Sequence, residues 1–220
     1  MDIDWSVFDK VIYINLKERH DRKNTIKKEL RSLGIPPHLI HRVEATRHLV
    51  GQIGRARSHL AAVETAISEG WGNVLILEDN MIFDTTAEAK ERLNAFLQTL
   101  EKIDWHCALL STRYRKVITL KSTDRIVKPV DAGSACAYAV HRDYRDTMRA
   151  CFATATGYLL KGGSPHEYAL ENTWLPLMQQ HRWIGMYPVA GHPAPGMSDT
   201  EGCVVDHTEH YYKELSVIAL

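Results

Sequence analysis

The sequence predicts a single α/β domain in which helices flank a mainly parallel, mixed central sheet, with a smaller α+β portion toward the C-terminus. Through roughly the first 110 residues, short apolar runs of strand type alternate with segments of helical spacing. One of these runs, NVLIL at residues 73–77, is almost wholly apolar, which is typical of a parallel strand covered by helices on both faces. After about residue 112 the strand-like runs become more mixed in character, which indicates the smaller second portion.

Residues 10–77 are expected to contain two strands, a short extended piece and two helices. KVIYINL, residues 10–16, is a short β-branched run and predicts a buried strand. A helix follows, capped by Asp21 and ended by Gly34, and HLIHRVEAT after it is extended. SHLAAVETAISEG, residues 58–70, predicts a helix capped by Ser58, and NVLIL is the next strand.

The remaining elements are shorter and less regular. TTAEAKERLNAFLQTL predicts a helix that opens with a capping box of Thr85 and Glu88, and WHCALLS predicts a strand. Three short strands are then expected at RKVITL, RIVKPV and SACAYAV. HRDYRDTMRACF and ENTWLPLMQQH predict helices on either side of a loop YLLKGGSPHEYA, and the strand WIGMYPV precedes the Pro- and Gly-rich loop GHPAPGMSDTEG.

Composition excludes several classes of protein. The 220 residues are 45% hydrophobic, and 27 Lys and Arg balance 27 Asp and Glu, so sequence-independent nucleic-acid binding is not expected. The 4 cysteines form no C-x-x-C pair, which favours reduced thiols in a core. Because no signal region opens MDIDWSVFDK and no run nears the roughly 20 apolar residues of a membrane span, we expect a soluble intracellular protein.

Three polar clusters follow predicted strands, at residues 15–22, 78–80 and 111–115. Ligands of open α/β sheets bind beyond the carboxyl ends of the strands, so the three clusters are expected to converge on one site. The first cluster is basic and begins a helix, which suits a diphosphate or a nucleotide but also suits a solvated basic face. Both interpretations of that cluster stay open.

The second cluster, Glu78-Asp79-Asn80, also has two interpretations. Its side chains are either oxygen ligands for a divalent cation or strand-end residues that form an ion pair or cap a helix. The 12 histidines include no H-E-x-x-H, so a zinc-dependent hydrolase is the least favoured class. No P-loop, G-x-S-x-G or G-x-G-x-x-G is present.

Together, the segments VIYINLKERHDRKNTI, IGRARSHLAAVETAISEG, NVLILEDNMIF, GSACAYAVHRDY and PVAGHPAPGMSD resemble the lipooligosaccharide glycosyltransferases of family 25, which include the collagen galactosyltransferase domains. The resemblance covers roughly residues 10–205. It implies a GT-A-type fold in one domain, residues 1–220, with a nucleotide-sugar-binding half (about 1–112) and an acceptor-binding half (about 113–220). It also implies inverting transfer of a hexose, typically galactose, from a UDP-sugar to a hydroxyl of a glycan or glycoconjugate such as lipooligosaccharide.

The resemblance also implies roles for residues of the three clusters. It assigns the nucleotide and donor site to Asn15, Arg19, Arg22, Ser58, His59, Glu78 and Asp79. The family's metal motif is Glu-Asp-Asp, and this chain replaces the last carboxylate by Asn80. The implied ligands of Mn²⁺ or Mg²⁺ are therefore Glu78, Asp79 and Asn80, with His192 from the far side of the cleft. A metal-independent enzyme that neutralises the diphosphate with Arg and His is the alternative.

An inverting transfer needs a general base for the acceptor hydroxyl. Glu171 stands where the family carries an Asp and is our choice, although a Glu in a first helical turn also complements the helix dipole. Asp199 is the second choice and would orient the acceptor or its loop. The implied partners are a UDP-sugar and a glycan or glycolipid, with no nucleic acid, in the cytoplasm or at the inner membrane face. A catalytically silent GT-A-fold binding module that lost metal ligation at Asn80 is the alternative function.

Overall fold

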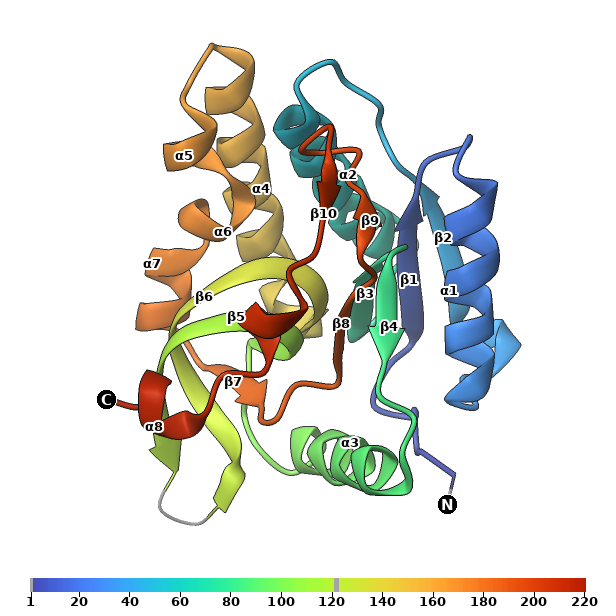
Figure 1. The fold of residues 1–220 in the computed structure, drawn as a ribbon, viewed down its shortest axis with the longest axis vertical. Coiled ribbons are helices and arrows are strands. Elements are labelled where there is room, and N and C mark those ends of the chain that lie inside the picture. The colour runs from blue at the N-terminus through green and yellow to red at the C-terminus, as the bar shows by residue number, and fades with distance from the viewer. Residues whose placement is uncertain (1, 121–122) are drawn as a thin grey trace.

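The computed structural model describes residues 2–120 and 123–220 and contains a six-stranded sheet (Figure 1). Its order is β2-β1-β3-β6-β5-β7, with bounds Ile40–Glu44, Lys10–Asn15, Val74–Glu78, Thr123–Val140, Cys107–Leu120 and Trp183–Met186. The pairs β1–β2, β1–β3 and β5–β7 are parallel, whereas β6 is antiparallel to β3, β5 and β7. Within this sheet only β6 therefore runs against the others, which confirms the predicted mainly parallel, mixed α/β class.

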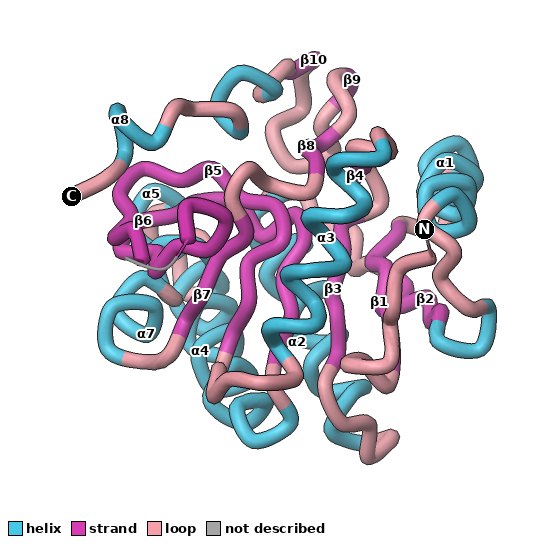
Figure 2. Tube along the Cα trace, turned by 90° about the horizontal axis from the view of Figure 1, so that it is seen from below, coloured by secondary structure: helices cyan, strands magenta, loops and turns pink. Residues whose placement is uncertain are grey.

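Helices cover both faces of the sheet (Figure 2). One face carries α2 (Gly51–Ser68), α4 (Arg145–Leu160) and α7 (Leu175–Gln180), and the other carries α1 (His20–Ser32) and α3 (Ala87–Leu100). Strand β3 shows why: Val74 and Ile76 join one apolar core, while Leu75 and Leu77 join the other. Successive side chains of a strand point to opposite faces, so an apolar strand needs cover on both.

Helix α2 begins at Gly51, earlier than the predicted cap at Ser58. Ser58 lies inside the helix, where its hydroxyl donates to the Gly54 carbonyl at 2.6 Å and accepts from the Thr46 backbone N–H at 2.8 Å. The glycines before Ser58 therefore belong to the helix and not to a turn. A Cβ on Gly54 would lie 2.6 Å from the Thr46 carbonyl oxygen, so this glycine permits the approach of the preceding loop.

Other boundaries also differ from prediction. WHCALLS and RKVITL form one strand, β5, and RIVKPV and SACAYAV form another, β6, because register shifts let two long strands stay paired. The predicted loop at YLL is the end of α4, and a short helix α5 (Pro165–Tyr168) follows it. ENTWLPLMQQH divides into α6 (Leu170–Thr173) and α7, and Thr86, not Thr85, caps α3 by accepting from the Ala89 N–H at 3.2 Å.

The C-terminal segment returns across the carboxyl edge of the sheet (Figure 1). Strand β8 (Gly191–Pro193) pairs with β4 (Met81–Phe83), and β9 (Gly196–Met197) pairs with β10 (Val204–Val205). We call residues 196–205 the strap. One-turn helices at Pro37–Leu39, Arg142–Tyr144 and Thr208–Tyr211 and the short α8 (Leu215–Ile218) complete the described chain. Within the described ranges, no helix has the length and apolar character to cross a bilayer.

Candidate active site

A cavity of about 910 Å³ lies at the carboxyl edge of β1 and β3. Its walls come from the first half of α2, the segment around α6, the strap, and the middle of β5 and β6. Many of the predicted site residues line it: Arg22, Ser58, His59, Glu78, Asp79, Asn80, Glu171 and Asp199. The fold therefore brings residues from distant parts of the chain to one hollow.

Arg55 connects two of these residues. Its Nε lies 2.6 Å from Glu78 Oε1, and one of its terminal nitrogens lies 2.6 Å from Glu171 Oε1. The side chains of Arg55, Glu78 and Glu171 are only 14%, 21% and 11% exposed. One guanidinium thus joins the end of β3 to the start of α6, and charge-assisted bonds of this length are strong.

The same guanidinium controls the protonation of both carboxylates. Burial is the largest single influence and acts to raise the pKa of Glu78 and of Glu171, but the charge of Arg55 and the hydrogen bonds to each carboxylate together lower both pKa values. His59 lies beside them, with Nε2 3.3 Å from Glu78 Oε1 and Nδ1 2.9 Å from the Tyr138 hydroxyl. Burial lowers the pKa of His59, so both glutamates are ionised and the imidazole is neutral at pH 7.

Asp79 is held by a second set of partners. Asn15 donates to Asp79 Oδ2 at 2.7 Å, and Arg22 lies 3.4 Å from Asp79 Oδ1. Arg42 fixes Asn15 in turn by donating to its side-chain oxygen at 3.0 Å. Burial raises the pKa of Asp79 in spite of the hydrogen bond from Asn15 and the charge of Arg22. Asn15 therefore does not line the cavity but orients Asp79, which does.

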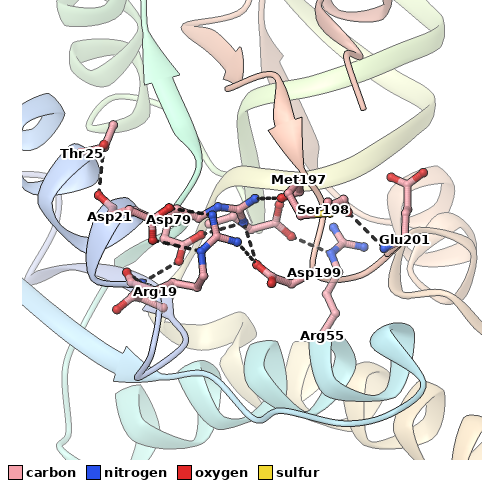
Figure 3. Close-up of polar contacts among 12 residues, drawn as sticks. Arg19, Asp21, Thr25, Arg55, Asp79, Met197, Ser198, Asp199 and Glu201 are labelled. Carbon is pink, nitrogen blue, oxygen red and sulfur yellow. Dashed lines mark hydrogen bonds and ion pairs between the residues drawn. The ribbon is translucent and has the colours of Figure 1, made fainter. Parts of the chain in front are cut away.

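The strap supplies a third group of contacts (Figure 3). Asp199 forms an ion pair with Arg19 and lies 3.4 Å from Arg22, whose guanidinium also donates to the Met197 carbonyl. At the other edge of the cavity the strap packs its Thr200 backbone against Gly51, where no Cβ has room. The strap therefore spans the hollow from the start of α1 to the start of α2.

The predicted metal ligands do not fit a divalent cation in this arrangement. Neighbouring residues at the end of β3 point apart, so Glu78 faces α2 and pairs with Arg55, whereas Asp79 faces α1 and pairs with Asn15 and Arg22. A cation between them would meet two guanidinium groups. Across residues 2–120 and 123–220, no group of three or more His, Cys, Asp or Glu side chains is placed to hold a metal ion.

The other two predicted ligands also lie apart from such a set. His192 is on β8, and its Nδ1 lies 3.0 Å from the Tyr212 hydroxyl instead of facing the acidic cluster. The Asn80 side-chain oxygen is buried and has no hydrogen-bond partner within the described chain. The Asn80 backbone carbonyl accepts from the Ala194 N–H at 2.7 Å, so the residue before β4 is joined to the residue after β8.

Sequence reasoning missed Arg55, although its signal was present. Arg55 stands three and four residues before Ser58 and His59, which places it on the same face of α2 toward the cavity. It also missed Ser134, and it noted Arg113 only as part of the third polar cluster. Ser134 carried no sequence signal, because its special feature is a backbone angle.

Comparisons with known proteins return similar solved structures at low identity. No protein-family model matches the chain, and no curated protein matches its sequence. A glycosyltransferase involved in the glycosylation of the major capsid of PBCV-1 is 12% identical, with 81% of each chain covered and a TM-score of 0.47. A mannose-1-phosphate geranyltransferase from Thermus thermophilus is 12% identical, with 80% of this chain and 72% of that chain covered and a TM-score of 0.43. An apo UDP-glucose pyrophosphorylase is 8% identical, with 83% of this chain and 74% of that chain covered and a TM-score of 0.45. Likenesses this distant assign no activity.

Proposed function

We propose that the protein is a UDP-sugar-dependent glycosyltransferase that transfers a hexose, galactose in the first instance, with inversion to a hydroxyl of a glycan or glycolipid. The observation that supports this most is the convergence of basic, acidic and imidazole side chains, expected from the sequence resemblance, on one cavity of the size a nucleotide-sugar needs. We place donor binding in the half before about residue 112 and acceptor binding in the half after it. The acceptor class and a place at the cytoplasmic membrane face come from the resemblance alone.

In the proposed reaction the donor diphosphate binds at the start of α1. Arg19 and Arg22 stand there, and their ion pairs with the Asp199 carboxylate support a place for an anion beside the two guanidiniums. Asp79, which Asn15 holds by a hydrogen bond, pairs with Arg22, and Ser58 fixes the loop before α2 through Thr46. His59, which stays neutral, contacts the Glu78 carboxylate that pairs with Arg55 and so helps to position it.

Glu171 is the proposed general base. It takes the proton of the acceptor hydroxyl while the acceptor oxygen bonds to the anomeric carbon and the bond from that carbon to the diphosphate breaks on the opposite side. UDP leaves with the bonding electrons, and arginines stabilise its charge. Asp199 is proposed to position the acceptor once the strap has released the arginine pair. No step is assigned to a metal ion, because the donor set does not fit one.

Binding of UDP is the first test. We expect saturating UDP, at about 100 times its dissociation constant, to stabilise the protein by about 2.7 kcal/mol. For a chain of this size that corresponds to a rise in melting temperature of roughly 5–10 °C. The rise should be the same in EDTA as in Mn²⁺, since arginines supply the positive charge. Differential scanning fluorimetry with UDP, UDP-galactose and AMP as the control measures it, and no shift with any nucleotide or nucleotide-sugar would remove the proposal.

The silent binding module remains the second candidate. Position 80 holds an amide where the resembled family carries a carboxylate, and both acids before it, Glu78 and Asp79, are engaged by arginines. Asn80→Asp discriminates between the two. If the silent module arose by loss of metal ligation, the substitution restores the missing carboxylate where a partnerless amide oxygen now lies, and a Mn²⁺-dependent rise in melting temperature that the parent lacks is expected. If Arg55 and Arg22 keep the other two acids engaged, as in the metal-independent transferase, no such rise is expected. Hydrolysis or transfer of UDP-galactose by the parent supports the transferase. Activity that appears only in the variant, with Mn²⁺, supports the silent module.

A further inference from the structure

The wall of the cavity formed by β5 and β6 carries another cationic group. Arg113, on β5, lines the cavity and is half-buried. Within residues 2–120 and 123–220 its guanidinium has neither a hydrogen bond nor an ion pair, whereas Arg22, Arg55 and Arg115 each pair with an acid. A guanidinium that faces a hollow without a protein counter-ion attracts an anionic ligand.

Ser134, on β6 beside Arg113, lines the same wall in a strained backbone conformation. Its φ is +83°, a region in which residues other than glycine are uncommon and strained. Thr112 holds this conformation, since its buried hydroxyl lies 2.6 Å from the Gly133 carbonyl and 3.0 Å from the Ser134 carbonyl. A side chain that is kept where glycine fits better points to a use for its hydroxyl.

Tyr211 prepares that hydroxyl as a donor. The Tyr211 phenol donates to Ser134 Oγ at 2.6 Å, and both side chains line the cavity. The Ser134 proton is left without an acceptor among the described residues, so it can turn to a ligand. A hydroxyl that accepts one hydrogen bond donates a stronger one, particularly where water is excluded.

This wall is separate from the expected diphosphate site. In the sheet order, β6 and β5 lie two and three strands away from β1. At about 4.8 Å per strand, Ser134 and Arg113 are on the order of 10–14 Å from the end of β1 across the sheet. One diphosphate cannot contact both groups, so an anion at this wall belongs to another part of the bound substrates.

We propose that Arg113 and Ser134, with Tyr211 behind them, form a second anion subsite that takes a carboxylate or a phosphate monoester carried by a sugar. The proposal rests on the proposed function, in which the chain after about residue 112, which supplies this wall, receives the acceptor next to the transferred hexose. The anion belongs either to the acceptor or to the transferred hexose. In both cases Arg113 contributes two parallel donors and Ser134 a third.

Ligand-observed NMR tests the subsite. With UDP present at saturation, glucose 6-phosphate and glucuronate are titrated against neutral glucose. In a second arm, UDP-glucuronate is compared with UDP-glucose. We expect about tenfold tighter binding of the charged member of at least one arm. Arg113→Gln should remove that preference and leave UDP binding unchanged. The control is Arg149→Gln, at an exposed arginine of α4 that pairs with Asp146.

A preference in the first arm assigns the anion to the acceptor, and one confined to the second arm assigns it to the donor sugar. Ser134→Ala removes the hydroxyl without introducing a larger side chain, and it should weaken the preference while UDP binding and a cooperative melting transition persist. Equal binding of charged and neutral sugars in both arms, or a preference that survives Arg113→Gln, overturns the subsite. Absence of UDP binding would count against the proposed function instead, and the first arm repeated without UDP would still decide the subsite.

Discussion

Glu171→Gln is expected to lower the rate of sugar transfer by about 10²–10⁴-fold, the usual contribution of a general base. Glutamine keeps the size of the side chain and can still accept a hydrogen bond from Arg55, so the cavity should keep its shape. The loss should therefore fall on kcat, while the UDP-induced rise in melting temperature stays within error of the parent. Steady-state transfer from UDP-galactose, followed by UDP release, measures the first quantity, and fluorimetry measures the second.

The matched control for this variant is Glu167→Gln. Glu167 lies on α5, one short helix earlier, and is exposed and outside the cavity lining. Its replacement should leave kcat and UDP binding unchanged. If Glu171→Gln turns over at the parental rate, Glu171 is not the base, and Asp199 becomes the residue to test next.

Arg55→Gln should have the largest effect on stability of any single substitution considered. It leaves Glu78 and Glu171 in a confined space without their shared counter-ion, and breaking one partner of a buried ion pair costs about 3–5 kcal/mol. For a chain of this length the melting temperature would fall by on the order of 10 °C. Urea unfolding at pH 7 measures the free energy, and Arg149→Gln is the control because its ion pair with Asp146 is exposed.

The pH dependence of this loss follows from the direction of the pKa shifts. In the parent, the folded-state pKa of both glutamates is lowered, so their contribution to stability is present above the unfolded pKa and is lost as the pH falls through the folded value. Without Arg55, burial raises both pKa values instead. The free energy of unfolding of the variant is then reduced most at neutral pH. The difference in this free energy between variant and parent should narrow as the pH falls toward about 4. A difference that does not change between pH 7 and pH 4 would contradict this account.

The arrangement of the sheet could be predicted in large part from periodicity. The apolar run before Glu78 needed helices on both faces, and the alternation of strands with helices indicated parallel pairing. The reversed direction of β6 could not be predicted, because it depends on pairing between segments far apart in the chain. The early start of α2 was missed for a different reason: Gly54 suggests a turn, but it serves a close approach by Thr46.

The sequence predicted which residues belong to the site, but not which of them form ion pairs with one another. Their position after the carboxyl ends of predicted strands indicated that Glu78 and Asp79 would meet the first basic cluster, and Asp79 does lie beside Arg22. The partner of Glu78 is Arg55, and their bond depends on how α2 lies against β3, which no local pattern describes. The same holds for Glu171, whose contact with Arg55 crosses from one half of the chain to the other.

The strap has a consequence for how affinity should be interpreted. Its Asp199 already pairs with Arg19 and Arg22, so a donor diphosphate bound there as proposed would have to displace Asp199 from both arginines. The measured dissociation constant of a donor then equals the intrinsic constant divided by the fraction of molecules in which the strap is released. If one molecule in about a hundred is open, a site with micromolar complementarity registers as one of roughly 0.1 mM. Modest binding would thus measure the population of open molecules as much as the quality of the contacts.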